Sequence, residues 1–139
     1  MRIVIDTNVL LSAFLWGGTP MQLIKQVRIH AVELVISPAL LEEFATVIVR
    51  AKFAAVIART TRTPTRILEQ LRTLAEVVVA PPLSQPVCRD PKDDIVLACA
   101  RAASAQLVVS GDDDLLALGV FDGIPIVPVA QAIKMVQAG

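Results

Sequence analysis

The chain has 139 residues, the usual size of one domain, and its hydrophobic content of 55% is enough for a substantial core. Its 13 Lys and Arg side chains balance 13 Asp and Glu side chains, which argues against a protein that coats nucleic acid by bulk electrostatics. We expect a single domain over residues 1–139, without a signal peptide or a membrane-spanning run, and therefore a cytoplasmic protein.

Periodic apolar runs and capping residues predict alternating strands and helices. The first half is predicted to contain a strand at 2–5, a helix opened by Thr19-Pro20, a strand at 32–36, a helix opened by Ser37-Pro38, and one or two helices within 53–75 that restart at Thr63-Pro64. The second half is predicted to contain a strand at 77–79, a helix opened by Asp90-Pro91, a strand at 107–110, a helical turn from Leu115 to Gly119, a strand at 124–127 and a helix after Pro128.

Continuously apolar strands that alternate with helices predict an α/β fold whose parallel sheet is covered on both faces. In such open sheets, ligands bind beyond the carboxyl ends of the strands, where the strand order reverses. Asp6 follows the first predicted strand and Asp112 follows the fourth. If those strands are parallel neighbours, both carboxylates lie on the same rim of the sheet.

Two further acids are expected to reach this rim from early residues of helices. In the helix after the second strand, Glu43 lies at the edge of the apolar face, whereas Glu42 points nearly opposite. In the helix before the fourth strand, Asp90 is the expected N-cap and Asp93 stands where a carboxylate helps to cap the first turn. Asp94 has no such local explanation and is the expected contributor.

Carboxylates gathered within a few ångströms repel one another, and their pKa values rise unless a cation offsets the charge. Mg²⁺ or Mn²⁺ suits a set of oxygen ligands, and such an ion activates water for attack on a phosphodiester. Cys88, Cys99 and His30 are too few to form a typical structural zinc site.

The charges are unevenly spread along the chain. Residues 50–72 are basic apart from Glu69, whereas aspartates crowd residues 90–122. A basic segment of this kind is either a solvated helical face or a phosphate-binding strip, and the sequence leaves both readings open.

Four segments resemble, in order, the motifs of the PIN-domain ribonuclease family: residues 3–13, 37–44, 90–98 and 107–116. The resemblance covers nearly the whole chain. It implies a three-layer α/β/α fold with a central five-stranded parallel sheet and Mg²⁺- or Mn²⁺-dependent cleavage of single-stranded RNA. It also implies that the protein acts as the homodimeric toxin of a type II toxin–antitoxin pair, with a cognate antitoxin as its partner. The metal-binding and catalytic carboxylates that it implies are Asp6, Glu43, Asp94 and Asp112.

Other polar residues match positions that support such sites. Asn8, Ser110 and Asp114 are expected to orient a carboxylate or a metal-bound water, or to cap a turn. Asp93 is the alternative third ligand if Asp94 points away. Trp16 is expected either to stack on a base or to pack in a core or dimer interface.

Two other functions remain to be weighed. A Mg²⁺-dependent phosphatase or phosphoacceptor domain also has an Asp after its first strand, but this chain lacks a second aspartate two residues after Asp6 and has no lysine between Lys92 and Lys134. The third reading is a non-enzymatic module that binds RNA or protein on the same fold. The mean hydropathy of +0.65 favours apolar surface covered by a second copy or an antitoxin. The RNA target and the number of metal ions stay open.

Overall fold

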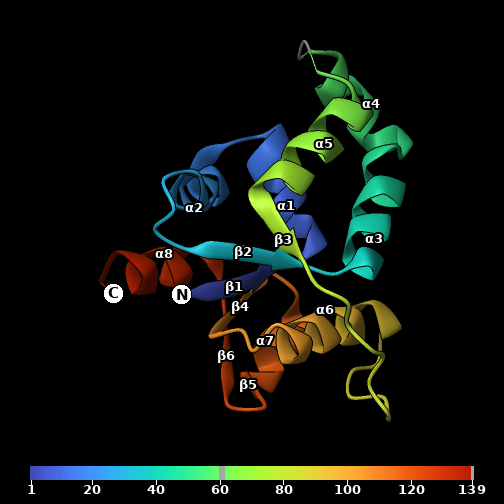
Figure 1. The fold of residues 1–139 in the computed structure, drawn as a ribbon. Helices are drawn as coiled ribbons and strands as arrows, with labels where there is room; N and C mark the ends of the chain where they lie inside the picture. Colours follow the sequence, from blue (N-terminus) through green and yellow to red (C-terminus); the bar gives the residue numbers. More distant parts are fainter. Residues whose placement is uncertain (60–61, 139) are drawn as a thin grey trace.

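A mostly parallel sheet forms the middle layer of the computed structural model, which describes residues 1–59 and 62–138 (Figure 1). Within those residues the sheet has six strands: β1 (Arg2–Ile5), β2 (Glu33–Ile36), β3 (Ala75–Val77), β4 (Leu107–Val109), β5 (Val120–Phe121) and β6 (Ile124–Val127). The strand order is β3-β2-β1-β4-β6-β5, and only the β5–β6 pair of this described sheet is antiparallel.

Helices cover both faces of the sheet. They are α1 (Thr7–Leu15), α2 (Gly18–Arg28), α3 (Pro38–Ile48), α4 (Ala51–Ala58), α5 (Pro64–Leu74), α6 (Pro91–Ala102), α7 (Asp113–Leu118) and α8 (Val129–Ala138). Figure 1 shows α1, α2 and α5 on one side of the strands and α6 and α7 on the other. The predicted three-layer α/β/α architecture is therefore confirmed. None of the helices in the described part of the chain is long and apolar enough to cross a membrane.

The predicted count of five strands is wrong by one, because β5 was not expected. β5 is a two-residue strand joined to β6 by a tight turn in which Asp122 and Gly123 have φ values of 51° and 76°. An Asp-Gly pair is a common signal for such a hairpin. β3 also lies two residues earlier than predicted, since its pairing with β2 matches Leu34 to Ala75 and Ile36 to Val77.

The helix caps decide where several elements begin. Ser37, Thr63 and Asp90 accept hydrogen bonds from backbone N–H groups of the helices that follow them, as their Xaa-Pro pairs predict. Thr19 is not a cap, because α2 already begins at Gly18, after Gly17 with a φ of 78°. α1 was not predicted at all; it begins directly after Asp6, which caps it.

The strand order reverses between β1 and β4. From β1 the chain moves outward through β2 to β3, and α6 then carries it back to β4 on the other side of β1. β1 and β4 are parallel neighbours, with Ile5 opposite Val109, so the residues that follow them lie side by side. In folds of this class, ligands bind at such a reversal, beyond the carboxyl ends of the strands.

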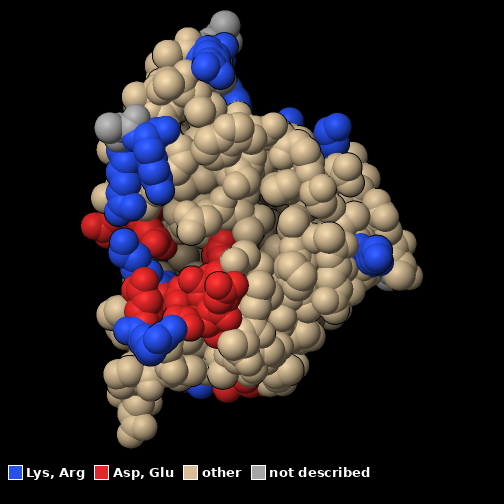
Figure 2. Space-filling view, turned by 180° about the vertical axis from the view of Figure 1, so that it is seen from behind, with Lys and Arg blue, Asp and Glu red and all other residues tan. Residues whose placement is uncertain are grey.

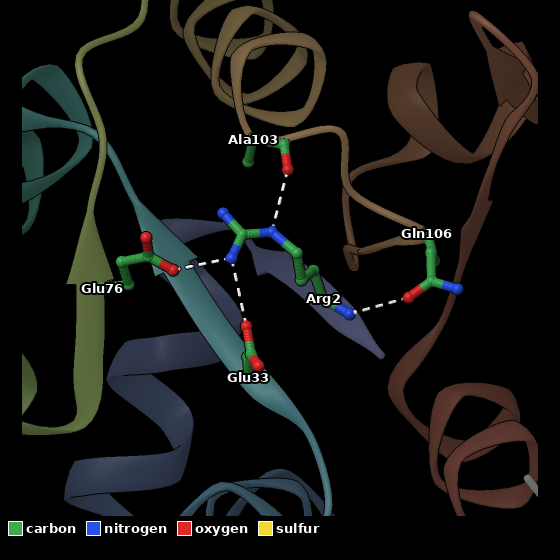
Figure 3. Close-up of polar contacts among 5 residues, drawn as sticks. All are labelled: Arg2, Glu33, Glu76, Ala103 and Gln106. Atoms are coloured by element: carbon green, nitrogen blue, oxygen red, sulfur yellow. Dashed lines mark hydrogen bonds and ion pairs between the residues drawn. The ribbon is translucent and has the colours of Figure 1, made fainter.

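Arg2 links several elements at the opposite end of the sheet, where the strands begin (Figure 3). Its guanidinium donates hydrogen bonds to Glu33 on β2 at 3.0 Å, to Glu76 on β3 at 2.6 Å and to the carbonyl of Ala103 at 2.9 Å. One arginine thus ties three adjacent strands to the end of α6.

Candidate active site

Three aspartates meet beside the carboxyl end of β4. Asp93 comes from the first turn of α6, whereas Asp112 and Asp114 come from the cap and first turn of α7. One carboxylate oxygen from each lies within 4.8 Å of the other two. Figure 2 shows that acidic side chains gather into a patch on this face, with Lys and Arg on either side of it.

Asp93 is the most constrained member of this cluster. The residue is 9% exposed, and its Oδ2 atom is fully buried without a hydrogen-bond partner among the described residues. Burial, followed by repulsion from Asp112 and Asp90, raises the pKa of Asp93 from 3.8 to about 6. Native proteins rarely leave such an oxygen unpaired, and doing so costs about 1–3 kcal/mol. The nearby carboxylates of Asp112 and Asp114 add negative charge around Asp93 and no donor.

Asp6 lies next to this cluster and is held by several donors. The backbone N–H of Val9 donates to its Oδ1 atom at 2.9 Å, and the Ser110 hydroxyl and the N–H of Gly111 donate to Oδ2. Burial raises the pKa of Asp6, although the bonds from Ser110 and the two N–H groups oppose that rise. Ser110 is fully buried, and its oxygen also accepts the N–H of Asp112 at 2.9 Å. Ser110 thus joins Asp6 to the aspartate cluster.

Glu43 reaches the same rim from α3. Its Oε2 atom accepts a hydrogen bond from the Thr7 hydroxyl at 2.8 Å, and Thr7 directly follows Asp6. Glu43 is half-buried and Glu42 is exposed, as the helical pattern predicts. Asp6 is therefore linked to Glu43 through Thr7 and to Asp112 through Ser110.

Asp94 does not join the aspartate cluster. Its carboxylate accepts the backbone N–H of Val87 at 3.1 Å and that of Cys88 at 2.8 Å, so it faces the loop before α6. The argument that Asp94 lacks a local partner was wrong, because these partners lie in a loop whose path the sequence pattern does not reveal. Asp93, named from the sequence as the alternative, takes the place beside Asp112.

Comparison with known proteins identifies the fold family. The model of the PIN domain family matches residues 2–114. The chain belongs to the PIN domain family. The solved structures include a similar one, the crystal structure of VapBC2 from Rickettsia felis bound to a DNA fragment from their promoter. That match has a TM-score of 0.58 and 10% sequence identity, and it covers 91% of this chain and 97% of the other. No curated protein sequence matches the chain.

Sequence reasoning missed two residues of this PIN domain site. Thr7 lies within the motif segment 3–13 but was given no role of its own, yet it links Asp6 to Glu43. Arg89 lies outside every predicted element, and its guanidinium donates to Asp114 at 2.7 Å. The position of Thr7 beside Asp6 was a usable signal. The pairing of Arg89 across 25 positions offered none.

A cavity of about 380 Å³ opens beside Asp112 on this PIN domain. Asn8 and Ser12 of α1 line it together with Gly111, Asp112 and Asp113. Asn8 is exposed there, so its amide lies on the surface that a ligand of the rim would contact.

The donor set of this PIN domain fits a hard divalent cation. Asp93, Asp112 and Asp114 offer carboxylate oxygens at close range, and the buried oxygen of Asp93 lacks a partner within the described chain. Mg²⁺ and Mn²⁺ prefer such oxygen ligands, whereas zinc sites in proteins are built mainly from His and Cys.

Proposed function

We propose that this PIN domain is an endoribonuclease that cleaves single-stranded RNA with the help of one or two Mg²⁺ or Mn²⁺ ions. The observation that carries the proposal is the unpartnered, buried oxygen of Asp93 beside Asp112 and Asp114. Acids this close together raise one another's pKa values and reduce stability, and a cation held among them offsets that cost. We take residues 1–139 to be one nuclease domain.

The cation would be held by Asp93, Asp112 and Asp114, with Asp6 and Glu43 facing the same rim. Bound there, the ion would activate a water and neutralise the negative charge that develops on the phosphodiester. This set replaces Asp94, the ligand expected from the motif resemblance, by its neighbour Asp93.

The surrounding residues hold the carboxylates in place. Three donors fix Asp6, so its carboxylate keeps one orientation at the end of β1. Ser110 also accepts the backbone N–H of Asp112, and the Thr7 hydroxyl donates to Glu43. Both contacts hold these acids in place relative to Asp6. Such outer contacts orient metal-binding groups and tune their affinity for the ion. The site is therefore preorganised before substrate arrives.

RNA suits this surface because cations flank the acids. The basic residues of the α4–α5 segment include the exposed side chains of Arg50, Lys52, Arg59 and Arg66. Figure 2 shows Lys and Arg on the part of the surface next to the acidic patch. A phosphate chain bound along these cations would pass into the acids, where cleavage occurs. Arg62 is not part of this strip, since it donates to the carbonyl of Phe14 at 2.6 Å and anchors α1.

The phosphatase or phosphoacceptor reading fits the site less well. Those activities need an exposed aspartate whose oxygen attacks phosphorus. Asp6 is buried, and both of its oxygens accept hydrogen bonds from the chain. A non-enzymatic module would not require an acid to be buried without a partner, so the Asp93 oxygen also argues against that reading.

We further propose that the protein acts in the cytoplasm as the toxin of a toxin–antitoxin pair, as a homodimer with a cognate antitoxin. The motif resemblance and the fold shared with VapBC2 support this role. Exposed apolar side chains support a covered surface: Trp16 is 58% exposed and lies outside the core, and Val49 and Val79 are also exposed.

The decisive experiment is cleavage of a labelled single-stranded RNA pool by the purified protein in Mn²⁺. We expect the parent to cut, EDTA to stop cleavage, and Asp6→Asn to abolish it without unfolding the protein. Asp122→Asn is the matched control, because Asp122 is an exposed aspartate paired with Arg101 far from the rim. Undiminished cleavage by Asp6→Asn, or an aspartyl phosphate after treatment with acyl phosphate, would defeat the proposal.

A further inference from the structure

Asp94 ties down the turn that precedes α6. Its two oxygens accept the consecutive N–H groups of Val87 and Cys88, and Asp90 caps the helix a few residues later. Hydrogen bonds from backbone N–H groups to a charged acceptor are among the stronger ones in proteins. The backbone on both sides of Arg89 is therefore held by carboxylates, and the position from which its side chain leaves the turn is set.

The side chain of Arg89 is less constrained than this backbone. It is 87% exposed and contacts Asp114 through a single Nη2–Oδ1 pair of 2.7 Å. An exposed ion pair of this kind contributes about 0–1 kcal/mol, so the guanidinium can exchange partners at little cost. Because Asp114 belongs to the aspartate cluster, this ion pair places the guanidinium at the edge of the cluster.

We propose that Arg89 binds a phosphate of the RNA next to the bond that is cut, and that Asp94 is its positioning residue. This inference rests on the proposed function. A cation held by the three aspartates offsets the charge that attracts Arg89 to Asp114. Its planar guanidinium then meets a phosphate with two parallel hydrogen bonds, a geometry that lysine cannot reproduce.

A different role for Arg89 makes the opposite prediction. If Arg89 served only as the counter-ion of the acids, its removal would tighten Mn²⁺ binding and leave RNA affinity unchanged. A phosphate contact instead predicts weaker RNA binding whether or not the affinity for Mn²⁺ changes.

The first test compares Arg89→Gln with Arg101→Gln by fluorescence anisotropy of a labelled random single-stranded RNA, with Ca²⁺ in place of the catalytic ion. Arg101 is a matched control, because it is also an exposed arginine paired with one aspartate. We expect Arg89→Gln to weaken RNA binding about tenfold and to lower the slope of log K against log salt by about 0.7. Arg89→Lys should restore the slope and only part of the affinity. An unchanged Kd for Arg89→Gln overturns the proposal.

The second test concerns Asp94 and uses Mn²⁺ titration calorimetry besides RNA binding. We expect Asp94→Asn to keep the Mn²⁺ affinity of the parent, to weaken RNA binding as much as Arg89→Gln does, and to add nothing to it in the double variant. Asp122→Asn should match the parent in both measurements. If Asp94→Asn instead loses Mn²⁺ binding, Asp94 is a metal ligand and the proposal is wrong.

Assays of the parent protein distinguish a failure of this proposal from a failure of the proposed function. A parent that neither binds nor cuts single-stranded RNA refutes the proposed function, and the assignment of Arg89 falls with it. A parent that cuts RNA while Arg89→Gln keeps the same kcat/KM and Kd refutes only the assignment of Arg89. Because Arg89 is almost fully exposed, its variants are expected to fold even if Asp94→Asn does not.

Discussion

The carboxylates at the two ends of the sheet differ in their neighbours and in their exposure to solvent. At the amino ends of the strands, Glu33 and Glu76 lie on the guanidinium of Arg2 (Figure 3), and their side chains are 64% and 54% exposed. At the carboxyl ends, Asp93 lies against Asp112 and Asp114, and it is 9% exposed. At the amino end one guanidinium contacts both glutamates, whereas at the other end Arg89 contacts only Asp114 and the buried Oδ2 atom of Asp93 has no partner among the described residues.

This difference separates a stabilising cluster from a functional one. Exposed acids that share an arginine need nothing further, and their contribution is modest. Buried acids that repel one another reduce stability, and such a cost persists where a bound ligand offsets it. We infer that Arg2 stabilises the fold and that the acids at the rim of β1 and β4 take part in the reaction.

The largest expected effect comes from Asp93→Asn. We expect it to lower the rate of RNA cleavage by about a thousandfold or more, because it removes a carboxylate from the proposed cation site. The metal-free variant should melt no lower than the parent, since the change also relieves repulsion with Asp112. Single-turnover cleavage and thermal melting in EDTA measure the two effects. Glu76→Gln, at the amino end, is the control and should cut RNA like the parent.

Added Mn²⁺ should stabilise the parent strongly. Binding to the folded state alone contributes about 2.7 kcal/mol at an ion concentration of 100 times Kd, which raises Tm by about 8 °C in a domain of this size. Asp93→Asn should show little of this rise, whereas Arg2→Gln should show all of it. Differential scanning fluorimetry with increasing Mn²⁺ measures the shift, and an equal rise in Asp93→Asn would contradict the assignment.

The stability of the metal-free protein should fall as pH rises from about 4 to about 6. The pKa of Asp93 in the folded protein is about 6, above its ordinary value of 3.8, so the folded state holds this proton more tightly. The stability gained from the bound proton is complete below pH 4 and is lost above pH 6, by at most about 3 kcal/mol. Asp6, whose pKa is also raised, acts in the same direction. Urea unfolding in EDTA across this range should give a flatter profile for Asp93→Asn.

The smallest expected effect belongs to the amino end. Arg2→Gln removes two exposed ion pairs and a hydrogen bond to the carbonyl of Ala103, and we expect a loss of about 1–2 kcal/mol in the free energy of unfolding. RNA cleavage at a temperature where the variant is folded should be unchanged. A tenfold loss of kcat without unfolding would show that the two ends are coupled.

The sequence pattern predicted the parts of the fold that local rules govern. Ser37, Thr63 and Asp90 cap helices as expected, and Asp6 and Asp112 follow neighbouring parallel strands. Those inferences need only periodicity, capping chemistry and crossover handedness.

Local rules could not predict the parts of the site that depend on distant contacts. Asp93 and Asp94 share the first turn of α6, and which of them faces the acids depends on the loop that donates N–H groups to Asp94. Arg89 and Asp114 are 25 positions apart, and they meet because the folded chain brings the start of α6 beside the start of α7. The strand β5 is a different case, since the Asp122-Gly123 turn was visible in the sequence and was overlooked.

A crystal grown with Mn²⁺ tests the central claim most directly, through the anomalous scattering of the ion. We predict a peak bonded to carboxylate oxygens of Asp93 and Asp112, and none beside Glu33 and Glu76. A peak coordinated by Asp94, or no peak at the rim of β1 and β4 with the three aspartates turned apart, would contradict the account.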